Sequence, residues 1–130
     1  VWDVSSGEMI KKMAGHEDWV QQVVFYNNDS KVISGSLDKT IKIWDASSSK
    51  NSATLKGHTG GVTCLAISKD EKYLVSGDTE KNIIVWDLST MSPIKNFVAH
   101  EGQVLSVVFS PDSLYFYSSS SDKTVKKWKL

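Results

Sequence analysis

Histidine, serine and aspartate residues occur in a combination that could support nucleophilic catalysis. His16, Ser34 and Asp38 are the base, nucleophile and orienting carboxylate that a Ser-His-Asp triad needs for acyl transfer. The same residue types return twice more along the chain, at His58 and Ser76 and at His100, Ser118 and Asp122. Because an enzyme needs such a triad only once, its repetition indicates a structural role, and we expect no enzymatic activity.

The repetition has a fixed period. Consecutive histidines lie 42 residues apart, and four of the five tryptophans follow the same spacing. No insertion breaks this phase, which is shared by His16, His58 and His100, by Ser34, Ser76 and Ser118, and by Trp2, Trp44, Trp86 and Trp128. A period of this length indicates a tandem-repeat fold in which each unit packs on the next.

The sequence pattern within each unit predicts four short β-strands. In the first unit an apolar run at residues 20–25 is followed by a polar turn and a second run at 32–35. Residues 40–44 then alternate in polarity with period two, as a strand with two different faces does, and a weaker segment spans 52–56. Turn residues separate these short segments throughout the chain, and helical periodicity is absent, which indicates an all-β fold.

The units resemble WD repeats, which form the four-stranded blades of β-propellers. The resemblance is carried by the segments from Gly15-His16 to Trp44-Asp45, from Gly57-His58 to Trp86-Asp87, and from Ala99-His100 to Trp128-Lys129. It implies an all-β fold of three four-stranded antiparallel propeller blades in an incomplete ring. Residues 1–14 would then contain the end of a preceding blade and an outer strand. The repeats would span 15–56, 57–98 and 99–130, and the last would lack its outer strand.

Three blades are too few to close a ring, since propellers typically have about 4 to 8. The sequence begins with Val1 and not with Met, and both of its ends fall inside a predicted third strand. We therefore expect a fragment of a larger propeller, although two chains could instead pair into one six-bladed ring. Residues 9–14 are a candidate for an outer strand that completes the last blade.

The resemblance implies a structural use for the triad-like residues. In WD repeats the Trp indole donates a hydrogen bond to Ser, Ser donates to His, and His donates to a carboxylate in the following turn. Glu80 stands at the turn position of the second unit, where the other units have Asp. The expected hydrogen-bond chains comprise His16, Ser34, Asp38 and Trp44; His58, Ser76, Glu80 and Trp86; and His100, Ser118, Asp122 and Trp128.

Metal binding and cofactor chemistry are not expected. The three histidines are a full unit apart, and Cys64 is the only cysteine, so no residues have the spacing of a metal site. With all three histidines used in structural chains, none remains as a general base. We therefore predict no catalytic residue, no metal site and no cofactor.

Trp19 is the one tryptophan outside the period, and it points to a binding surface. By the resemblance it occupies one of three positions per blade that line the rim of the propeller channel and often contact ligands. The candidate rim residues are Trp19, Gln21 and Leu37; Gly61, Thr63 and Thr79; and Gln103, Leu105 and Ser121. None is charged, which favours a partner peptide of mixed apolar and polar character over a phosphorylated one.

The charge balance narrows the class of partner. Fifteen basic and fifteen acidic residues give a formal net charge of zero, which argues against nucleic-acid binding and against a polybasic membrane anchor. We expect a protein–protein interaction scaffold that presents a propeller surface to peptides or domains within a larger complex. The alternative is a regulatory or substrate-recognition propeller segment of a larger multidomain enzyme or signalling receptor.

The expected partners are other proteins at the rim, together with the remaining blades of a parent chain or a second copy. No apolar run approaches the roughly 18 to 20 residues of a membrane-spanning helix. A single cysteine leaves no internal disulfide, which fits a reducing compartment. We therefore expect an intracellular protein, in the cytoplasm or the nucleus.

Overall fold

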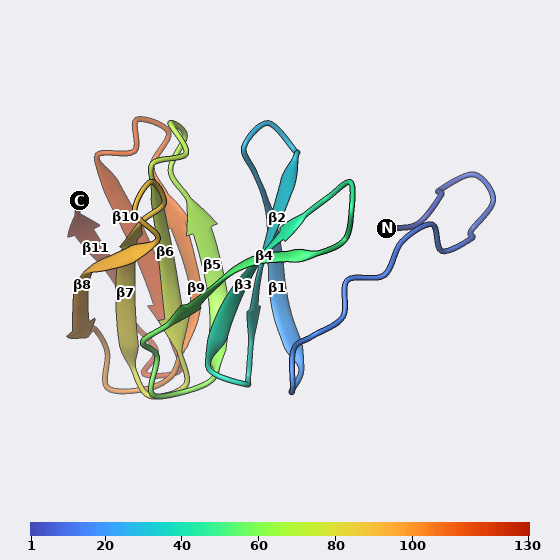
Figure 1. Ribbon diagram of the computed structural model, residues 1–130. Helices are drawn as coiled ribbons and strands as arrows, with labels where there is room; N and C mark the ends of the chain where they lie inside the picture. The colour runs from blue at the N-terminus through green and yellow to red at the C-terminus, as the bar shows by residue number, and fades with distance from the viewer.

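A computed structural model describes residues 1–130, and its regular elements are all β-strands. They form three antiparallel sheets that stand side by side (Figure 1), and we call them blades 1, 2 and 3 in chain order. Blade 1 holds β1 (Val20–Tyr26), β2 (Lys31–Ser36), β3 (Thr40–Asp45) and β4 (Asn51–Lys56). Blade 2 holds β5 (Val62–Ile67), β6 (Tyr73–Asp78), β7 (Asn82–Asp87) and β8 (Ser92–Val98). Blade 3 holds β9 (Val104–Phe109), β10 (Tyr115–Ser120) and β11 (Val125–Lys129).

The predicted all-β blade architecture is confirmed. Within each blade the strands follow one another in sequence order, and each pairs with its predecessor. Blade 3 has three strands, and β11 pairs only with β10. No helix that could cross a membrane occurs in the structure.

The N-terminal segment, residues 1–14, contains only an isolated bridge. Met9 pairs with Trp2 in an isolated bridge, and the N-terminal segment lies away from blade 3 at the other side of the molecule (Figure 1). The carboxylate of Asp3 holds the intervening turn by accepting hydrogen bonds from the amides of residues 5 and 6. Lys11 donates to two backbone carbonyls of the β3–β4 turn, which keeps the segment beside blade 1.

The hydrophobic core lies between the blades. Side chains alternate along each strand, so a blade presents one apolar face to each neighbour. One cluster joins blades 1 and 2, with Ile33 and Ile43 on one side and Leu74 and Trp86 on the other. A second cluster joins blades 2 and 3 and contains Cys64. Stacking of successive units therefore provides most of the burial, as is general for repeat proteins.

Polar contacts fix how the blades sit on one another. Gln22 Oε1 in β1 accepts a hydrogen bond from the amide of Leu65 in β5, at 2.9 Å. The Thr63 hydroxyl in β5 donates to the carbonyl of Val104 in β9, at 2.5 Å. These contacts join the first strands of successive blades, so that β1 lies beside β5 and β5 beside β9.

Candidate functional site

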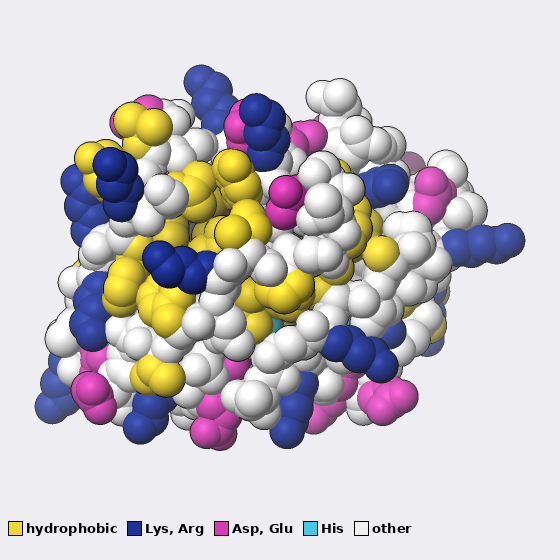
Figure 2. Space-filling view, turned by 60° about the vertical axis from the view of Figure 1, so that its left-hand side comes forward, with side chains coloured by type: hydrophobic (Ala, Val, Ile, Leu, Met, Phe, Trp, Pro, Cys, Tyr) yellow, Lys and Arg dark blue, Asp and Glu magenta, His cyan; other side chains and the backbone are white.

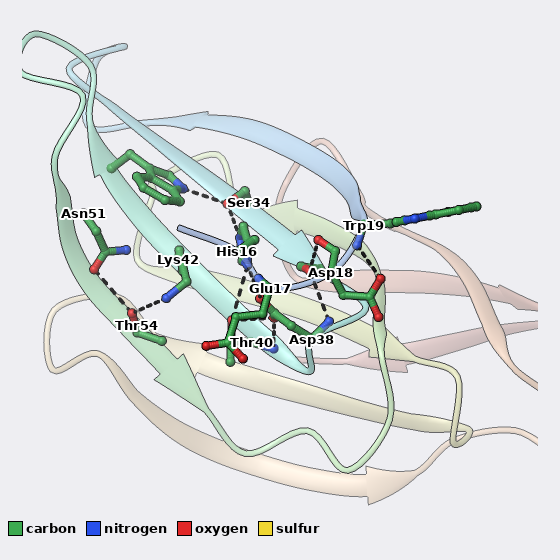
Figure 3. Close-up of polar contacts among 12 residues, drawn as sticks. His16, Glu17, Asp18, Trp19, Ser34, Asp38, Thr40, Lys42, Asn51 and Thr54 are labelled. Carbon is green, nitrogen blue, oxygen red and sulfur yellow. Dashed lines mark hydrogen bonds and ion pairs between the residues drawn. The ribbon is translucent and has the colours of Figure 1, made fainter. Parts of the chain in front are cut away.

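Blade 1 contains a hydrogen-bonded chain of four side chains that crosses the sheet (Figure 3). Trp44 Nε1 in β3 donates to Ser34 Oγ in β2 at 2.7 Å, and Ser34 Oγ lies 2.7 Å from His16 Nε2. His16 Nδ1 lies 2.7 Å from Asp38 Oδ2 in the β2–β3 turn. The chain therefore ties the loop before β1 to the two middle strands of the blade.

Blade 3 repeats this arrangement. Trp128 Nε1 donates to Ser118 Oγ at 2.8 Å, and Ser118 Oγ lies 2.7 Å from His100 Nε2. His100 Nδ1 lies 2.8 Å from Asp122 Oδ2. In both blades the structure brings together the four residue types that the resemblance implied.

Blade 2 departs from the expected chain at its carboxylate. The Trp86, Ser76 and His58 members lie as in the other blades, with Nε1–Oγ and Oγ–Nε2 distances of 2.8 and 2.6 Å. His58 Nδ1, however, contacts Asp78 Oδ2 at 2.8 Å, and Glu80 is not a member. The Glu80 prediction is wrong because Asp78 ends β6 directly beside His58, while the longer Glu80 side chain is exposed.

The hydrogen bonds of each chain have a defined direction. Burial alone would raise the pKa of Asp38, but hydrogen bonds from Thr40, the Glu17 amide and His16 outweigh it and hold the pKa well below its usual range. An ionised carboxylate only accepts, so His16 Nδ1 donates to it. His16 Nε2 then accepts from the Ser34 hydroxyl, whose oxygen accepts from the Trp indole.

The same geometry makes acyl transfer implausible, although it resembles a Ser-His-Asp triad. Ser34, Ser76 and Ser118 are all buried, so no substrate carbonyl can approach the hydroxyl oxygens. Each oxygen also already accepts a hydrogen bond from an indole N–H, which lowers its nucleophilicity. No buried side-chain nitrogen or oxygen lacks a partner, as expected for a structural network.

Cys64 is a packing residue. It lies buried between blades 2 and 3, and burial is the main cause that raises the pKa of its thiol to about 11. A thiol with so high a pKa is almost entirely protonated at neutral pH and is a weak nucleophile. No group of histidine, cysteine and carboxylate side chains is arranged to hold a metal ion.

Six of the candidate rim residues are joined in pairs by backbone hydrogen bonds, and the candidates differ in how exposed they are. Trp19 and Leu37 are joined by a backbone hydrogen bond of 2.9 Å, and the equivalent bonds join Gly61 to Thr79 and Gln103 to Ser121, each at 3.0 Å. The structure thus brings these pairs together at the end of each blade. The exposed members are Trp19, Gln21, Gln103, Leu105 and Ser121, whereas Leu37 and Thr79 are half-buried.

Gly61 and Thr63 serve the contact between blades. A Cβ on Gly61 would lie 2.7 Å from Leu37 Cδ2, so the absence of a side chain lets blade 1 pack closely on blade 2. Thr63 is half-buried, and its hydroxyl bonds the carbonyls of Gly77 and Val104. The expectation that these two residues are free for a partner is therefore corrected. Sequence analysis did not identify Gln22 as a residue that joins blades 1 and 2; its only signal is that it is one of two adjacent glutamines in a mostly apolar strand.

Trp19 is the largest of the candidate rim side chains. It is 75% exposed, whereas Trp44 is 3% exposed, and its indole makes no hydrogen bond. Figure 3 shows the ring extending away from the blade, beyond Asp18, whose carboxylate accepts a hydrogen bond from the Trp19 amide at 2.7 Å. The blade holds the backbone of Trp19 in place and leaves its ring to solvent.

Comparison with known proteins agrees with this geometry. Residues 7–45, 49–87 and 91–129 each match the family model described as "WD domain, G-beta repeat". These segments keep the period of 42 residues but begin ahead of the Gly-His or Ala-His pairs.

Two curated proteins match about one repeat of the chain. Nuclear distribution protein nudF 2 of Talaromyces marneffei is 43% identical over 42 residues, which is 32% of this chain and 9% of that protein. Periodic tryptophan protein 2 homolog of Schizosaccharomyces pombe is 40% identical over 43 residues, which is 33% of this chain and 5% of that protein.

Two solved structures match nearly the whole chain. They are described as the structure of U3-55K and the crystal structure of RRP9 WD40 repeats, and each has a TM-score of 0.86 and 31% sequence identity over 91% of this chain. The chain covers 38% and 37% of these structures, respectively. It therefore spans little more than a third of the solved structures and less than a tenth of the curated relatives.

Proposed function

The chain belongs to the WD40 repeat family, whose members are generally non-catalytic scaffolds that bind other proteins in complexes, and we propose that it is itself such a scaffold. Its blades would present the rim to a peptide or domain of a partner protein and perform no chemistry of their own. The buried hydrogen-bond chains support this role because they use the catalytic-type residues to hold the blades rigid.

The exposure of Trp19 is the observation that carries the proposal. Exposing a large aromatic ring to water is unfavourable, and the fold gains nothing from it here because the indole has no partner. Aromatic side chains are enriched among the residues that contribute most to protein–protein binding. The backbone of Trp19 is hydrogen-bonded to that of the half-buried Leu37, which fixes the position from which the ring extends.

The chemistry of the rim favours a peptide of mixed character. Gln21 and Gln103 are exposed and offer amide donors and acceptors, while Trp19 and Leu105 offer apolar area. None of the candidate rim residues carries a charge. An apolar side chain of the partner would cover Trp19, and the backbone of the partner peptide would form hydrogen bonds with the side-chain amides of Gln21 and Gln103. A location inside the cell, in the cytoplasm or nucleus, fits the single unpaired Cys64.

A peptide selection tests this proposal directly. A library of random peptides displayed on phage is selected on the immobilised chain, and the enriched peptides are synthesised and titrated. We expect their affinity to fall by roughly thirtyfold or more in Trp19→Ala, because a buried aromatic anchor contributes about 2 kcal/mol or more to binding. The matched control is Tyr115→Ala, which alters an aromatic residue of another blade.

If no peptide is enriched, or if the enriched peptides bind Trp19→Ala and the unaltered chain equally well, then the rim of blade 1 is not a binding surface. Thermal melts of both variants are recorded alongside, so that a loss of binding is separated from a loss of folding.

A further inference from the structure

Asp18 is a charged residue beside the candidate rim, and the repeat does not account for it. One and two repeats later the same position holds Gly60 and Gly102. In blade 1 this acid is followed by Trp19, and no other blade has an acid followed by an aromatic residue here. The loop before β1 therefore carries two side chains, one charged and one aromatic, that the common pattern of the blades does not require.

The glycines of blades 2 and 3 show that this position normally has no room for a side chain. A Cβ on Gly60 would lie 2.6 Å from Thr79 Oγ1 and 2.7 Å from the Glu80 nitrogen. A Cβ on Gly102 would overlap Ser121 Oγ in the same way. All of these atoms belong to the blade that contains the glycine, so the space is set within one blade and not by its neighbours. Blade 1 departs from this arrangement to admit the side chain of an aspartate.

The blade holds the backbone at Asp18 and leaves its carboxylate in solvent. The Asp18 carbonyl accepts a hydrogen bond from Ser36 Oγ at 3.0 Å, and the Trp19 carbonyl accepts one from the Leu37 amide at 2.9 Å. One carboxylate oxygen accepts from the Trp19 amide at 2.7 Å, while the other forms no hydrogen bond or ion pair. Figure 3 shows this carboxylate beside the start of the Trp19 side chain.

The surrounding charges leave Asp18 available to a partner. The carboxylate of Asp38, in the adjacent turn, is already bonded to His16. Lys39 in that turn is exposed and forms no ion pair, and the exposed Glu17 adds a second negative charge beside Asp18. Along the lower edge of the molecule in Figure 2, acidic and basic side chains are interspersed. A partner therefore meets Asp18 as a local negative charge and not as part of a broad acidic field.

We infer that Asp18 selects partner peptides in which a lysine or arginine lies within two positions of the apolar residue that covers Trp19. Side chains two positions apart in an extended peptide project from the same face about 7 Å apart. The long stem of a basic residue can follow the indole while its charged group donates to the free oxygen of Asp18. Complementary charges of this kind set the register and the choice of partner. This inference rests on the function proposed above and adds a charge requirement to it.

Parallel peptide selections test the charge requirement. The random phage library is selected on the unaltered 130-residue chain and on Asp18→Asn, which keeps the shape of the side chain and removes its charge. On the unaltered chain we expect lysine and arginine to be enriched about threefold or more within two positions of an apolar residue, and on Asp18→Asn we expect no such enrichment. The matched control is Glu101→Gln, which removes an exposed acid from blade 3 and should leave the enrichment unchanged.

A double-mutant cycle then measures the contact itself. The tightest basic peptide, and the same peptide with its basic residue replaced by glutamine, are titrated by fluorescence anisotropy into the unaltered chain and into Asp18→Asn. Removing either charge should weaken binding about three- to fivefold, and removing both should weaken it little further, because the two charges act on each other. The difference between the two peptides should shrink as NaCl is raised from about 50 mM to about 500 mM.

The outcomes separate this inference from the function on which it rests. If the enriched peptides need Trp19 but carry no basic residue near the apolar one, the proposed function stands and the inference is wrong. If replacing the basic residue has the same effect in Asp18→Asn as in the unaltered chain, that residue contacts another group, such as the face of the indole, and the inference is also wrong. If no peptide is enriched, both fail. Thermal melts of each variant confirm that a change in binding is not a change in folding.

Discussion

Asp78 accepts a hydrogen bond from His58 Nδ1 at 2.8 Å, and it does so from the last position of β6 instead of the following turn. Its second oxygen accepts from the amides of Glu80 and Asn82, each at 2.9 Å. In blade 1 two residues share these tasks: Ser36 Oγ accepts from the Asp38 amide, and Asp38 bonds to His16. A single carboxylate thus replaces a serine and an aspartate.

This relationship predicts opposite behaviour for the two acidic residues of blade 2. Asp78→Ala should lower the free energy of unfolding by about 3 kcal/mol or more, because it leaves His58 and two turn amides without acceptors in a buried site. Glu80→Gln should change it by less than about 0.5 kcal/mol, since the Glu80 side chain is exposed. Urea denaturation of both variants measures the difference. A larger loss in Glu80→Gln would mean that Glu80 and not Asp78 supports His58.

Acid should destabilise the protein through these carboxylates. Burial alone would raise the pKa of Asp78, but hydrogen bonds from His58 and Asn82 hold it below its ordinary value of 3.8. A group with a lowered pKa contributes stability above its unfolded-state pKa and loses it as the pH falls through the folded-state pKa. The urea midpoint should therefore change little from this cause between about pH 7 and 5 and fall below about pH 4.

The variant Asp78→Asn measures how much the Asp78 carboxylate contributes to the loss of stability in acid. The variant is less stable at neutral pH, but its stability should decline less steeply between about pH 4 and 2, because one proton-binding group is gone. Glu80→Gln serves as the control. Parallel pH profiles for Asp78→Asn and the unaltered chain would show that Asp78 titrates alike in the folded and unfolded states.

Replacing each of the two tryptophans of blade 1 should have very different effects on the free energy of unfolding. Trp44→Ala removes a buried ring and the donor to Ser34, which should cost about 3 to 5 kcal/mol of stability. Trp19→Ala should cost less than about 0.5 kcal/mol, because the ring is exposed and unpartnered. Chemical denaturation of the two variants provides the comparison. If Trp19→Ala unfolds as readily as Trp44→Ala, Trp19 is a packing residue and not part of the partner surface.

The isolated chain should self-associate through the open face of blade 1. Val23 and Phe25 in β1 are 59% and 67% exposed, whereas Leu65, one repeat after Val23, is buried against blade 1. Replacing Val23 and Phe25 together by Thr should shift the chain towards monomer in sedimentation velocity, because contiguous exposed apolar area drives association. Val98→Thr, at an equally exposed site of β8, is the control. Unchanged association in the double variant would assign the contact to another surface.

The blades themselves follow from local features of the sequence. Short apolar runs, alternating strands and turn residues recur every 42 residues, and each hairpin forms within one unit, so the strand order needs no information from distant residues. The hydrogen-bond chains of blades 1 and 3 have the members that the resemblance implied, because each chain connects residues of a single repeat.

The roles of single side chains between and within the blades were decided only by the three-dimensional packing. The physical reason is that the contacts between blades join side chains that lie about one repeat apart in the sequence. Thr63 bonds to the carbonyl of Val104 in the next blade, and this contact depends on how blades 2 and 3 pack on each other. In blade 2 the carboxylate that bonds to His58 comes from the end of β6 and not from the turn, and the repeat pattern alone, which aligns Glu80 with Asp38 and Asp122, did not reveal this exchange.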